Sequence, residues 1–205
     1  MYKKKKLINM WSVFTWMRDL LAEYTWFWWS SNDSRSKAVL LVGLDDAGKS
    51  TLTGRLTKNC LIQAPPTSQP STHEMQIGST ILSVTDIGGH HQARRLWRTY
   101  MFASTRIVFV IDASNRQRIP EARYELLKIL DDEEIQSMPI LILANKIDKT
   151  HVACSENELR SLLQIEEHLN GENPRVKLCM CSIARNEGFT DGLKWLIKQP
   201  IKLND

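Results

Sequence analysis

The sequence is poor in cysteine, and the spacing of its cysteines excludes two common uses of the residue. It has four, which fit neither a zinc-binding pair nor a redox C-x-x-C motif: Cys60, Cys154, Cys179 and Cys181. A chain of 205 residues can also build a core without disulfide bonds. We therefore expect buried free thiols, with Cys179 and Cys181 on one face of a strand, in a protein of the reducing cytosol.

Outside its N-terminal segment the chain has no excess of charge of either sign. Residues 1–37 hold seven lysines and arginines against three acids, whereas the other 168 residues hold 20 against 20. A neutral body argues against a nucleic-acid-binding face, so we expect no nucleic-acid partner. The apolar content of 42% excludes wholesale disorder, and the length fits one domain with an appendage.

The N-terminal segment lacks an uninterrupted apolar run and a small-residue cleavage site, which argues against a secretory signal peptide. A membrane-spanning helix over Leu7–Trp29 is the alternative, but Arg18, Asp19 and Glu23 lie near its middle. A central arginine or aspartate disfavours insertion by roughly 2.5–3.5 kcal/mol. What the segment does have is tryptophan, with five of the chain's seven in the first 29 residues.

These residues fit an amphipathic helix with a basic start. At roughly 100° per residue, one side collects Met10, Phe14, Met17, Leu21, Tyr24 and Trp28. Asp19 and Glu23 fall on the opposite side, and Lys3–Lys6 precede the helix, an arrangement that suits an anionic bilayer surface. Docking on the protein's own core is the alternative, and a helix that switches sides satisfies both. Because residue 2 is tyrosine rather than glycine, a myristoyl anchor is not expected.

We therefore expect a basic, tryptophan-rich membrane-binding helix over residues 1–29, a polar linker over 30–37 and a globular domain over 38–205. In that domain, strand-like apolar runs cover 37–43, 80–86, 106–112, 139–146 and 175–181, and stretches with helical character cover 50–59, 121–134, 155–169 and 190–198. The alternation predicts an α/β fold with a mostly parallel sheet and helices on both faces. In such a sheet the ligand site lies at the carboxyl ends of the strands.

The first strand runs directly into the motif GLDDAGKS (Gly43–Ser50), which fits the phosphate-binding pattern G-x-x-x-x-G-K-S/T. Its glycines let backbone amides cradle the α- and β-phosphates, Lys49 reaches the β- and γ-phosphates, and the Ser50 hydroxyl ligates Mg²⁺. Because amides do the cradling, both carboxylates of the motif can turn away from the phosphates. The expected nucleotide-binding residues here are Asp45, Asp46, Ala47, Gly48, Lys49, Ser50 and Thr51.

Three further motifs end later strands. In DIGG (Asp86–Gly89), the aspartate can hold Mg²⁺ through water, and the amide of Gly89 can reach the γ-phosphate. In NKID (Asn145–Asp148), Asp148 can accept the two adjacent donors of guanine while Asn145 and Lys146 brace the loop. Adenine offers no such donor pair, so this motif favours GTP and argues against a P-loop kinase. The last motif, CSI, begins a run whose amides can contact the guanine oxygen: Ser182, Ile183 and Ala184.

In this order the motifs resemble those of the Ras-like small GTPases. The stretches GLDDAGK, DIGGHHQARRLWR (Asp86–Arg98), PILILANKID and CSIARNEGF resemble the COPII-coat small GTPases, the secretion-associated Ras-related group close to the Arf proteins. The similarity covers about residues 37–197, and its most specific feature is His90, where other Arf relatives typically carry glutamine. The resemblance implies a P-loop NTPase of the Ras-like G-domain fold, with a mostly parallel six-stranded sheet.

The resemblance also implies a function and its partners. It implies slow GTP hydrolysis in which His90 orients the attacking water, with Mg²⁺ held by Ser50, Ser71 and Asp86. A COPII inner-coat subunit is the implied GTPase-activating partner, and an ER membrane protein the implied exchange factor. GTP binding is implied to move the protein from the cytosol to ER exit sites, by inserting residues 3–29 into the ER membrane, and to start coat assembly for ER-to-Golgi transport. Self-association on membranes and a Golgi location are further expectations.

Some positions depart from the family pattern. Switch I, usually P-T-S-E-E, reads PSTHE here (Pro70–Glu74). Ser71 keeps a hydroxyl for Mg²⁺, Thr72 is the alternative after a one-residue slip, and His73 alters the effector surface. Asp46 stands where the family usually has asparagine. The alternative function is a GTP-binding scaffold held permanently on the membrane, resembling the β subunit of the signal-recognition-particle receptor.

Overall fold

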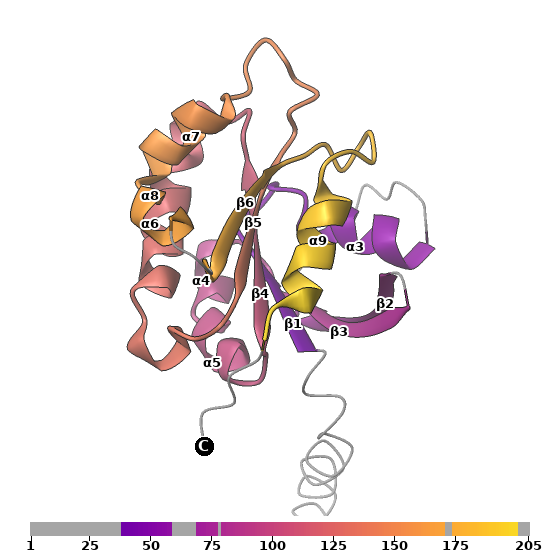
Figure 1. Ribbon diagram of the computed structural model, residues 1–205. Helices are drawn as coiled ribbons and strands as arrows, with labels where there is room; N and C mark the ends of the chain where they lie inside the picture. The colour runs from indigo at the N-terminus through magenta and orange to yellow at the C-terminus, as the bar shows by residue number, and fades with distance from the viewer. Residues whose placement is uncertain (1–37, 59–68, 78, 171–173, 201–205) are drawn as a thin grey trace, which may run out of the picture. The chain divides into compact units, whose positions relative to one another are not determined.

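The computed structural model describes residues 38–58, 69–77, 79–170 and 174–200, all within one compact unit, Ser36–Asp205 (Figure 1). The expected N-terminal helix, the linker and Cys60 lie outside the described residues. Within them, no helix is both long enough and apolar enough to span a bilayer.

A six-stranded sheet forms the centre of the domain, in the order β2-β3-β1-β4-β5-β6 (Figure 1). Its strands are β1 (Ala38–Val42), β2 (Ser71–Ile77), β3 (Thr80–Asp86), β4 (Arg106–Asp112), β5 (Ile140–Asn145) and β6 (Val176–Met180). Only β2 pairs antiparallel, with β3; the other neighbours are parallel. The predicted mostly parallel six-stranded sheet is confirmed.

Helices cover both faces of the sheet, as predicted (Figure 1). One face carries α4 (His91–Arg94), α5 (Trp97–Phe102), α6 (Ile119–Leu130), α7 (Glu156–Leu163) and α8 (Glu166–Leu169); the other carries α3 (Lys49–Lys58) and α9 (Phe189–Lys198). Two short 3₁₀ turns, η2 (Arg116–Arg118) and η3 (Glu133–Ile135), flank α6.

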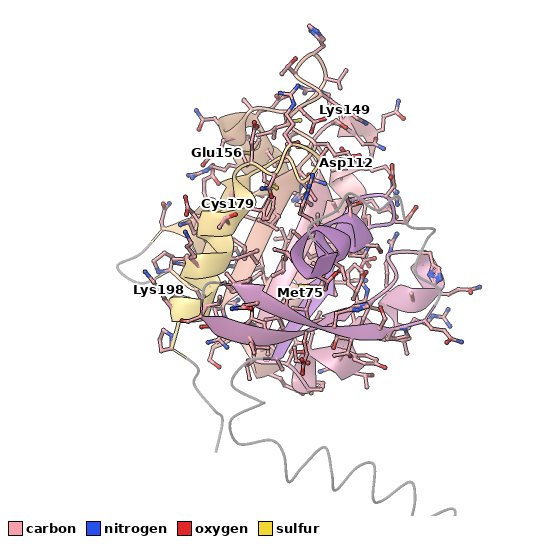
Figure 2. All side chains as sticks on the ribbon, turned by 90° about the vertical axis from the view of Figure 1, so that its right-hand side faces the viewer. Met75, Asp112, Lys149, Glu156, Cys179 and Lys198 are labelled. Atoms are coloured by element: carbon pink, nitrogen blue, oxygen red, sulfur yellow. The ribbon has the colours of Figure 1, made fainter. Side chains whose placement is uncertain are left out.

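The strands need apolar residues at successive positions because both of their faces are buried. In β1, Leu40 and Val42 belong to the core cluster that contains Trp97, whereas Val39 and Leu41 belong to the other cluster. This second cluster includes Leu52 of α3, Met75 of β2 and Leu193 of α9, and Figure 2 shows Met75 beneath α3. Cys181 also lies in it, and Cys179 packs against it, so both thiols are on one side of the sheet as expected.

Two predicted helices have different bounds in the structure. The stretch 121–134 is helical only to Leu130, and the helix begins earlier, at Ile119, with Pro120 in its first turn. The stretch 155–169 forms two helices because Gln164 adopts a left-handed conformation (φ 54°) that ends α7. Strand β2 was not predicted from the sequence, because its exposed face carries polar residues at alternate positions.

Candidate nucleotide-binding site

Backbone packing explains why the loop after β1 contains glycines. Gly43 has φ +138°, and a Cβ there would lie 2.1 Å from the carbonyl oxygen of Val110. Gly48 has φ +105°, and a Cβ there would lie 2.3 Å from Nδ2 of Asn145. Since other residues rarely adopt these angles and have no room here, the loop is held in one shape by β4 and the NKID motif.

The DIGG motif packs on the same loop. A Cβ at Gly89 would lie 2.2 Å from the amide nitrogen of Asp45, so only glycine permits this contact. The buried indole of Trp97 donates a hydrogen bond to the carbonyl of Gly88 (3.2 Å), which fixes the motif from the side of α5. The structure therefore places the expected γ-phosphate contact, Gly89, against the phosphate-binding loop.

Asn145 joins three of the four motifs. Its side-chain Nδ2 donates to the carbonyl of Ala47 in the first loop (2.9 Å), and its Oδ1 accepts from the amide of Ile183 in the last (3.0 Å). The residue is 4% exposed, so these hydrogen bonds form away from competing water. One side chain at the end of β5 thus holds together loops that are far apart in the sequence.

The expected guanine-reading carboxylate is oriented by the CSI motif. The hydroxyl of Ser182, which is fully buried, donates to Oδ1 of Asp148 (2.6 Å) and accepts from the amide of Arg185 (3.1 Å). The carbonyl of Ala184 accepts from Nη2 of Arg55 in α3 (2.8 Å). This geometry fits a carboxylate that is pre-oriented for two donors, as the N1–H and amine of guanine require.

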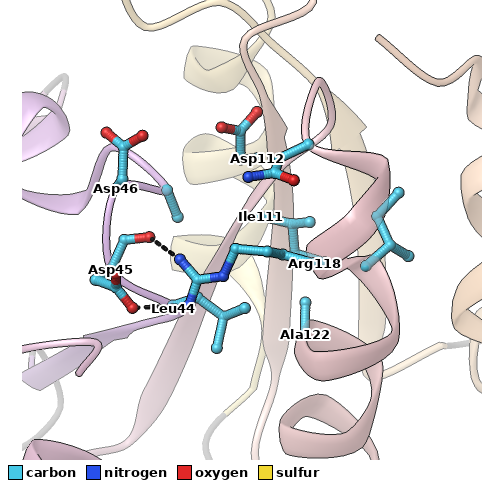
Figure 3. Close-up of a pocket in the computed structure, with 10 residues that line it drawn as sticks. Leu44, Asp45, Asp46, Ile111, Asp112, Arg118 and Ala122 are labelled. Atoms are coloured by element: carbon cyan, nitrogen blue, oxygen red, sulfur yellow. Dashed lines mark hydrogen bonds and ion pairs between the residues drawn. The ribbon is translucent and has the colours of Figure 1, made fainter. Parts of the chain in front are cut away.

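The two carboxylates of the first loop both have cationic partners. Asp45 pairs with Arg118 at 2.8 Å (Figure 3), and this hydrogen bond holds the pKa of Asp45 below its usual range. Asp46 pairs with Nζ of Lys146 at 3.1 Å, and the same ammonium contacts Asp112 at 2.8 Å. Each of the two carboxylates is thus paired with a neighbouring cation, which reduces the repulsion of a phosphate in the loop.

Lys49 is almost completely buried, at 5% exposure, and its Nζ donates to the carbonyls of Gly43 and Leu44 at 2.9 Å each. Burial lowers the pKa of Lys49 to about 8, although the nearby carboxylate of Asp86 acts in the opposite direction. A buried ammonium without a full counter-charge favours the arrival of an anion such as phosphate.

Asp86 and Ser50 form the centre of the expected metal site. The Ser50 hydroxyl donates to Oδ2 of Asp86 (2.9 Å), whereas the buried Oδ1 has no hydrogen-bond partner in the described part of the chain. Burial raises the pKa of Asp86, against the Ser50 hydrogen bond and the charge of Lys49. A buried, under-coordinated carboxylate beside a hydroxyl fits a hard cation such as Mg²⁺. The described residues contain no group of three or more His, Cys, Asp or Glu side chains suited to a metal.

The structure separates the two candidate switch I hydroxyls. Ser71 lies directly opposite Asp86 in the β2–β3 register, and its Oγ is 3.1 Å from Nε2 of His73. Thr72, the next residue, points to the opposite face of the strand. There its Oγ1 is 3.1 Å from Oγ1 of Thr85. Ser71 is therefore the hydroxyl on the Asp86 side.

His90 caps the N-terminus of α4. It is partly buried, and its Nδ1 accepts a hydrogen bond from the amide of Ala93 (3.3 Å). Because Nδ1 accepts this hydrogen bond, the ring N–H donor is at Nε2. Nε2–H can donate a hydrogen bond to the oxygen of a water molecule.

An ionic network that the sequence pattern did not predict lies beside these motifs. Arg94 of α4, whose side chain is 9% exposed, donates to the carbonyl of Gly89 (2.7 Å) and pairs with Glu121 (2.6 Å) and Glu125 (3.2 Å). Arg118 pairs with the same Glu121 (2.9 Å) and with Asp45, which connects α4 to the phosphate-binding loop through α6. In the sequence, only the i, i+3 spacing of Arg118 and Glu121 indicates a part of this ionic network.

Comparison with known proteins agrees with this geometry. The model of the ADP-ribosylation factor (Arf) family matches residues 26–200. The chain belongs to this family. Two relatives are Small COPII coat GTPase SAR1 of Giardia intestinalis, 36% identical over 80% of this chain and 90% of the relative, and ADP-ribosylation factor-like protein 3 of Caenorhabditis elegans, 34% identical over 81% and 89%.

A solved structure of an Arf-family protein has the same fold. The Arl6 BBS3 small GTPase of Trypanosoma brucei, with the bound nucleotide analogue GppNp, superimposes with a TM-score of 0.68 at 26% identity, covering 78% of this chain and 94% of that one. Membership of the Arf family confirms the predicted resemblance, the Ras-like G-domain fold and the class of activity. The protein is a GTPase, and its nucleotides are GTP and GDP.

Proposed function

We propose that this Arf-family protein is a Mg²⁺-dependent GTPase switch that initiates COPII coat assembly at the ER membrane. The observation that carries the nucleotide-binding part is Asn145, which holds the Ala47 and Ile183 loops around one site. The COPII part is supported by the similarity to Small COPII coat GTPase SAR1 of Giardia intestinalis and by the stretch GGHHQARRLWR.

In this proposal each part of the site has a defined task. The backbone amides of residues 45–51 and the ammonium of Lys49 bind the phosphates. Asp148 binds guanine together with the loop of Ser182, Ile183 and Ala184, in which the amide of Ile183 donates to Asn145 and that of Ser182 to the carbonyl of Glu187. Ser50, Ser71 and Asp86 hold Mg²⁺, which offsets phosphate charge when bound. His90 orients the attacking water through Nε2–H. Intrinsic hydrolysis is slow, and an arginine from a GTPase-activating partner adds positive charge for the transition state.

The membrane part of the proposal rests on residues 3–29. Their tryptophan-rich apolar side and the Lys3–Lys6 cluster support GTP-dependent insertion into the cytoplasmic face of the ER membrane. The proposed partners are a COPII inner-coat subunit as GTPase-activating protein and an ER membrane exchange factor. Cytosolic residence with GDP, self-association on membranes with GTP and a Golgi location belong to the same proposal.

Flotation of the full-length protein with anionic liposomes tests the switch. With a non-hydrolysable GTP analogue we expect most of the protein in the lipid fraction, and with GDP most of it free. The matched control is Leu21→Asp, which places a charge on the apolar side of the expected helix and should abolish flotation with either nucleotide. Equal flotation with both nucleotides would replace the switch with the permanently anchored scaffold.

A further inference from the structure

The inner face of β2 brings a histidine to the expected metal site. Ser71, His73, Met75 and Ile77 alternate along one face of the strand; Met75 is 1% exposed and Ile77 9%, so this face points into the domain. Leu82, Val84 and Asp86 share that face on the paired strand β3. The half-buried His73 therefore lies beside Ser71 and near Asp86.

The contact between His73 and Ser71 has a consequence for cation binding. A serine hydroxyl has one proton and two lone pairs. To ligate a cation it must direct a lone pair at the metal, and its proton must then point elsewhere. Nε2 of His73, 3.1 Å from Ser71 Oγ, is an acceptor for that proton. When Nε2 accepts, the ring is the Nδ1–H tautomer and the oxygen of Ser71 is both oriented and more electron-rich.

We propose that His73 is a positioning residue for the metal site: it accepts the hydroxyl proton of Ser71 and thereby directs the Ser71 oxygen at the divalent cation of the GTP-bound protein. The inference rests on the proposed role of Ser71 as a metal ligand. His73 does not touch the cation or the nucleotide. Its effect passes through one hydroxyl, so it should disappear when that hydroxyl is removed.

A purely structural role for His73 predicts a different outcome. The ring lies on the same inner face of β2 as Met75, so removing it could loosen the edge strand and weaken binding of every nucleotide alike. A positioning role affects only the state in which Ser71 ligates the cation. The two roles therefore differ in nucleotide dependence and in dependence on Ser71.

The test measures release of a fluorescent GTP analogue and of fluorescent GDP from the full-length protein, at pH 8, across a Mg²⁺ titration. His73→Leu removes the acceptor, His73→Phe removes it while keeping a ring, and His73→Gln keeps an acceptor oxygen. We expect His73→Leu and His73→Phe to raise the half-saturating Mg²⁺ concentration with the GTP analogue by roughly 10-fold, the scale of losses when the partner of a metal ligand is removed. His73→Gln should stay within about threefold of the parent, and none should change the GDP titration. The control His168→Leu, in α8, should change neither.

The Ser71→Ala background separates the two possible failures. In that background we expect His73→Leu to have no further effect, because the two substitutions act on one interaction. If Ser71→Ala itself leaves both Mg²⁺ titrations unchanged, the proposed metal role of Ser71 fails. If Ser71→Ala shifts the titration but His73→Leu does not, or shifts it equally with and without Ser71, the positioning role of His73 is wrong.

Discussion

At the residue scale, Lys49 shows how a binding group is prepared at a cost in stability. Its ammonium is almost fully buried against two carbonyls, and burial dominates its pKa, which falls to about 8 from an ordinary 10.5. A buried cation of this kind destabilises the folded protein until an anion arrives. The charge proposed to bind phosphate is therefore the same charge that weakens the nucleotide-free domain.

This cost gives a pH dependence with a definite sign. Between about pH 8 and 10.5 the unfolded chain keeps the Lys49 proton and the folded protein loses it. The contribution of Lys49 to the free energy of unfolding therefore increases as pH rises through that window, by at most about 1.4 kcal/mol per pH unit. We expect the difference in unfolding free energy between the parent and Lys49→Met, both nucleotide-free, to grow in favour of the parent from pH 7.5 to 10. Urea denaturation measures it, and a difference independent of pH would contradict the buried charge.

At the element scale, α4 is too short to hold its own position. It has four residues, His91–Arg94, and its N-terminus carries the proposed water-orienting residue, His90. Arg94 ties it to the carbonyl of Gly89 and to two acids of α6, while Trp97 of the next helix holds Gly88. The segment proposed to contact the γ-phosphate is thus positioned by α5 and α6 rather than by its own helical hydrogen bonds.

Removing Arg94 should lower the free energy of unfolding more than removing its partner Glu125. Arg94→Met leaves Glu125, 14% exposed at its side chain, without its closest cation, so we expect a loss of about 3 kcal/mol in unfolding free energy. Adding Glu125→Gln should restore roughly half of that loss, because the unpaired charge is gone. Denaturation of the GDP-loaded proteins, completed as a double-mutant cycle, gives both values. Simple additivity of the two substitutions would mean that the pair is not coupled.

The elements differ in how well the sequence predicts them. β4 is apolar between Arg106 and Asp112, and β5 is apolar up to Asn145, because both of their faces are buried, and this pattern located them closely. β2 was not predicted from the sequence because it is an edge strand with a polar outer face. Its antiparallel register with β3 defines it. The break between α7 and α8 depends on the backbone conformation of Gln164, a residue with no strong preference for it. Motif residues were predictable from spacing, whereas Arg94 and Arg118 depend on contacts across 27 to 73 positions.

At the scale of the whole molecule, the site draws on almost the full width of the sheet. The expected phosphate-binding loop follows β1, the proposed metal residues lie on α3, β2 and β3, and the proposed guanine-binding loops follow β5 and β6. Hydrogen bonds of Asn145 and Ser182 close the loops onto one another. A ligand that binds this site would contact loops from several strands, so its binding should stabilise the whole domain.

Stabilisation of the domain by a bound nucleotide gives a test of the site that does not depend on catalysis. GDP with Mg²⁺ at about 100 times its dissociation constant should add about 2.7 kcal/mol to the unfolding free energy, and chelating the metal should remove part of that gain.

Asp148→Asn should exchange the preferred nucleotide. Xanthosine diphosphate, whose base carries an oxygen where guanine has an amine, should stabilise the variant, while GDP loses most of its stabilising effect. Ser182→Ala is the matched control, because it removes the hydroxyl that orients Asp148 but keeps the carboxylate, so it should weaken stabilisation by GDP without creating a preference for xanthine. Thermal unfolding of the parent and both variants with each nucleotide measures all of these changes. If Asp148→Asn kept its preference for GDP, the guanine-reading role of Asp148 would be wrong, even though the fold and the phosphate loop would stand.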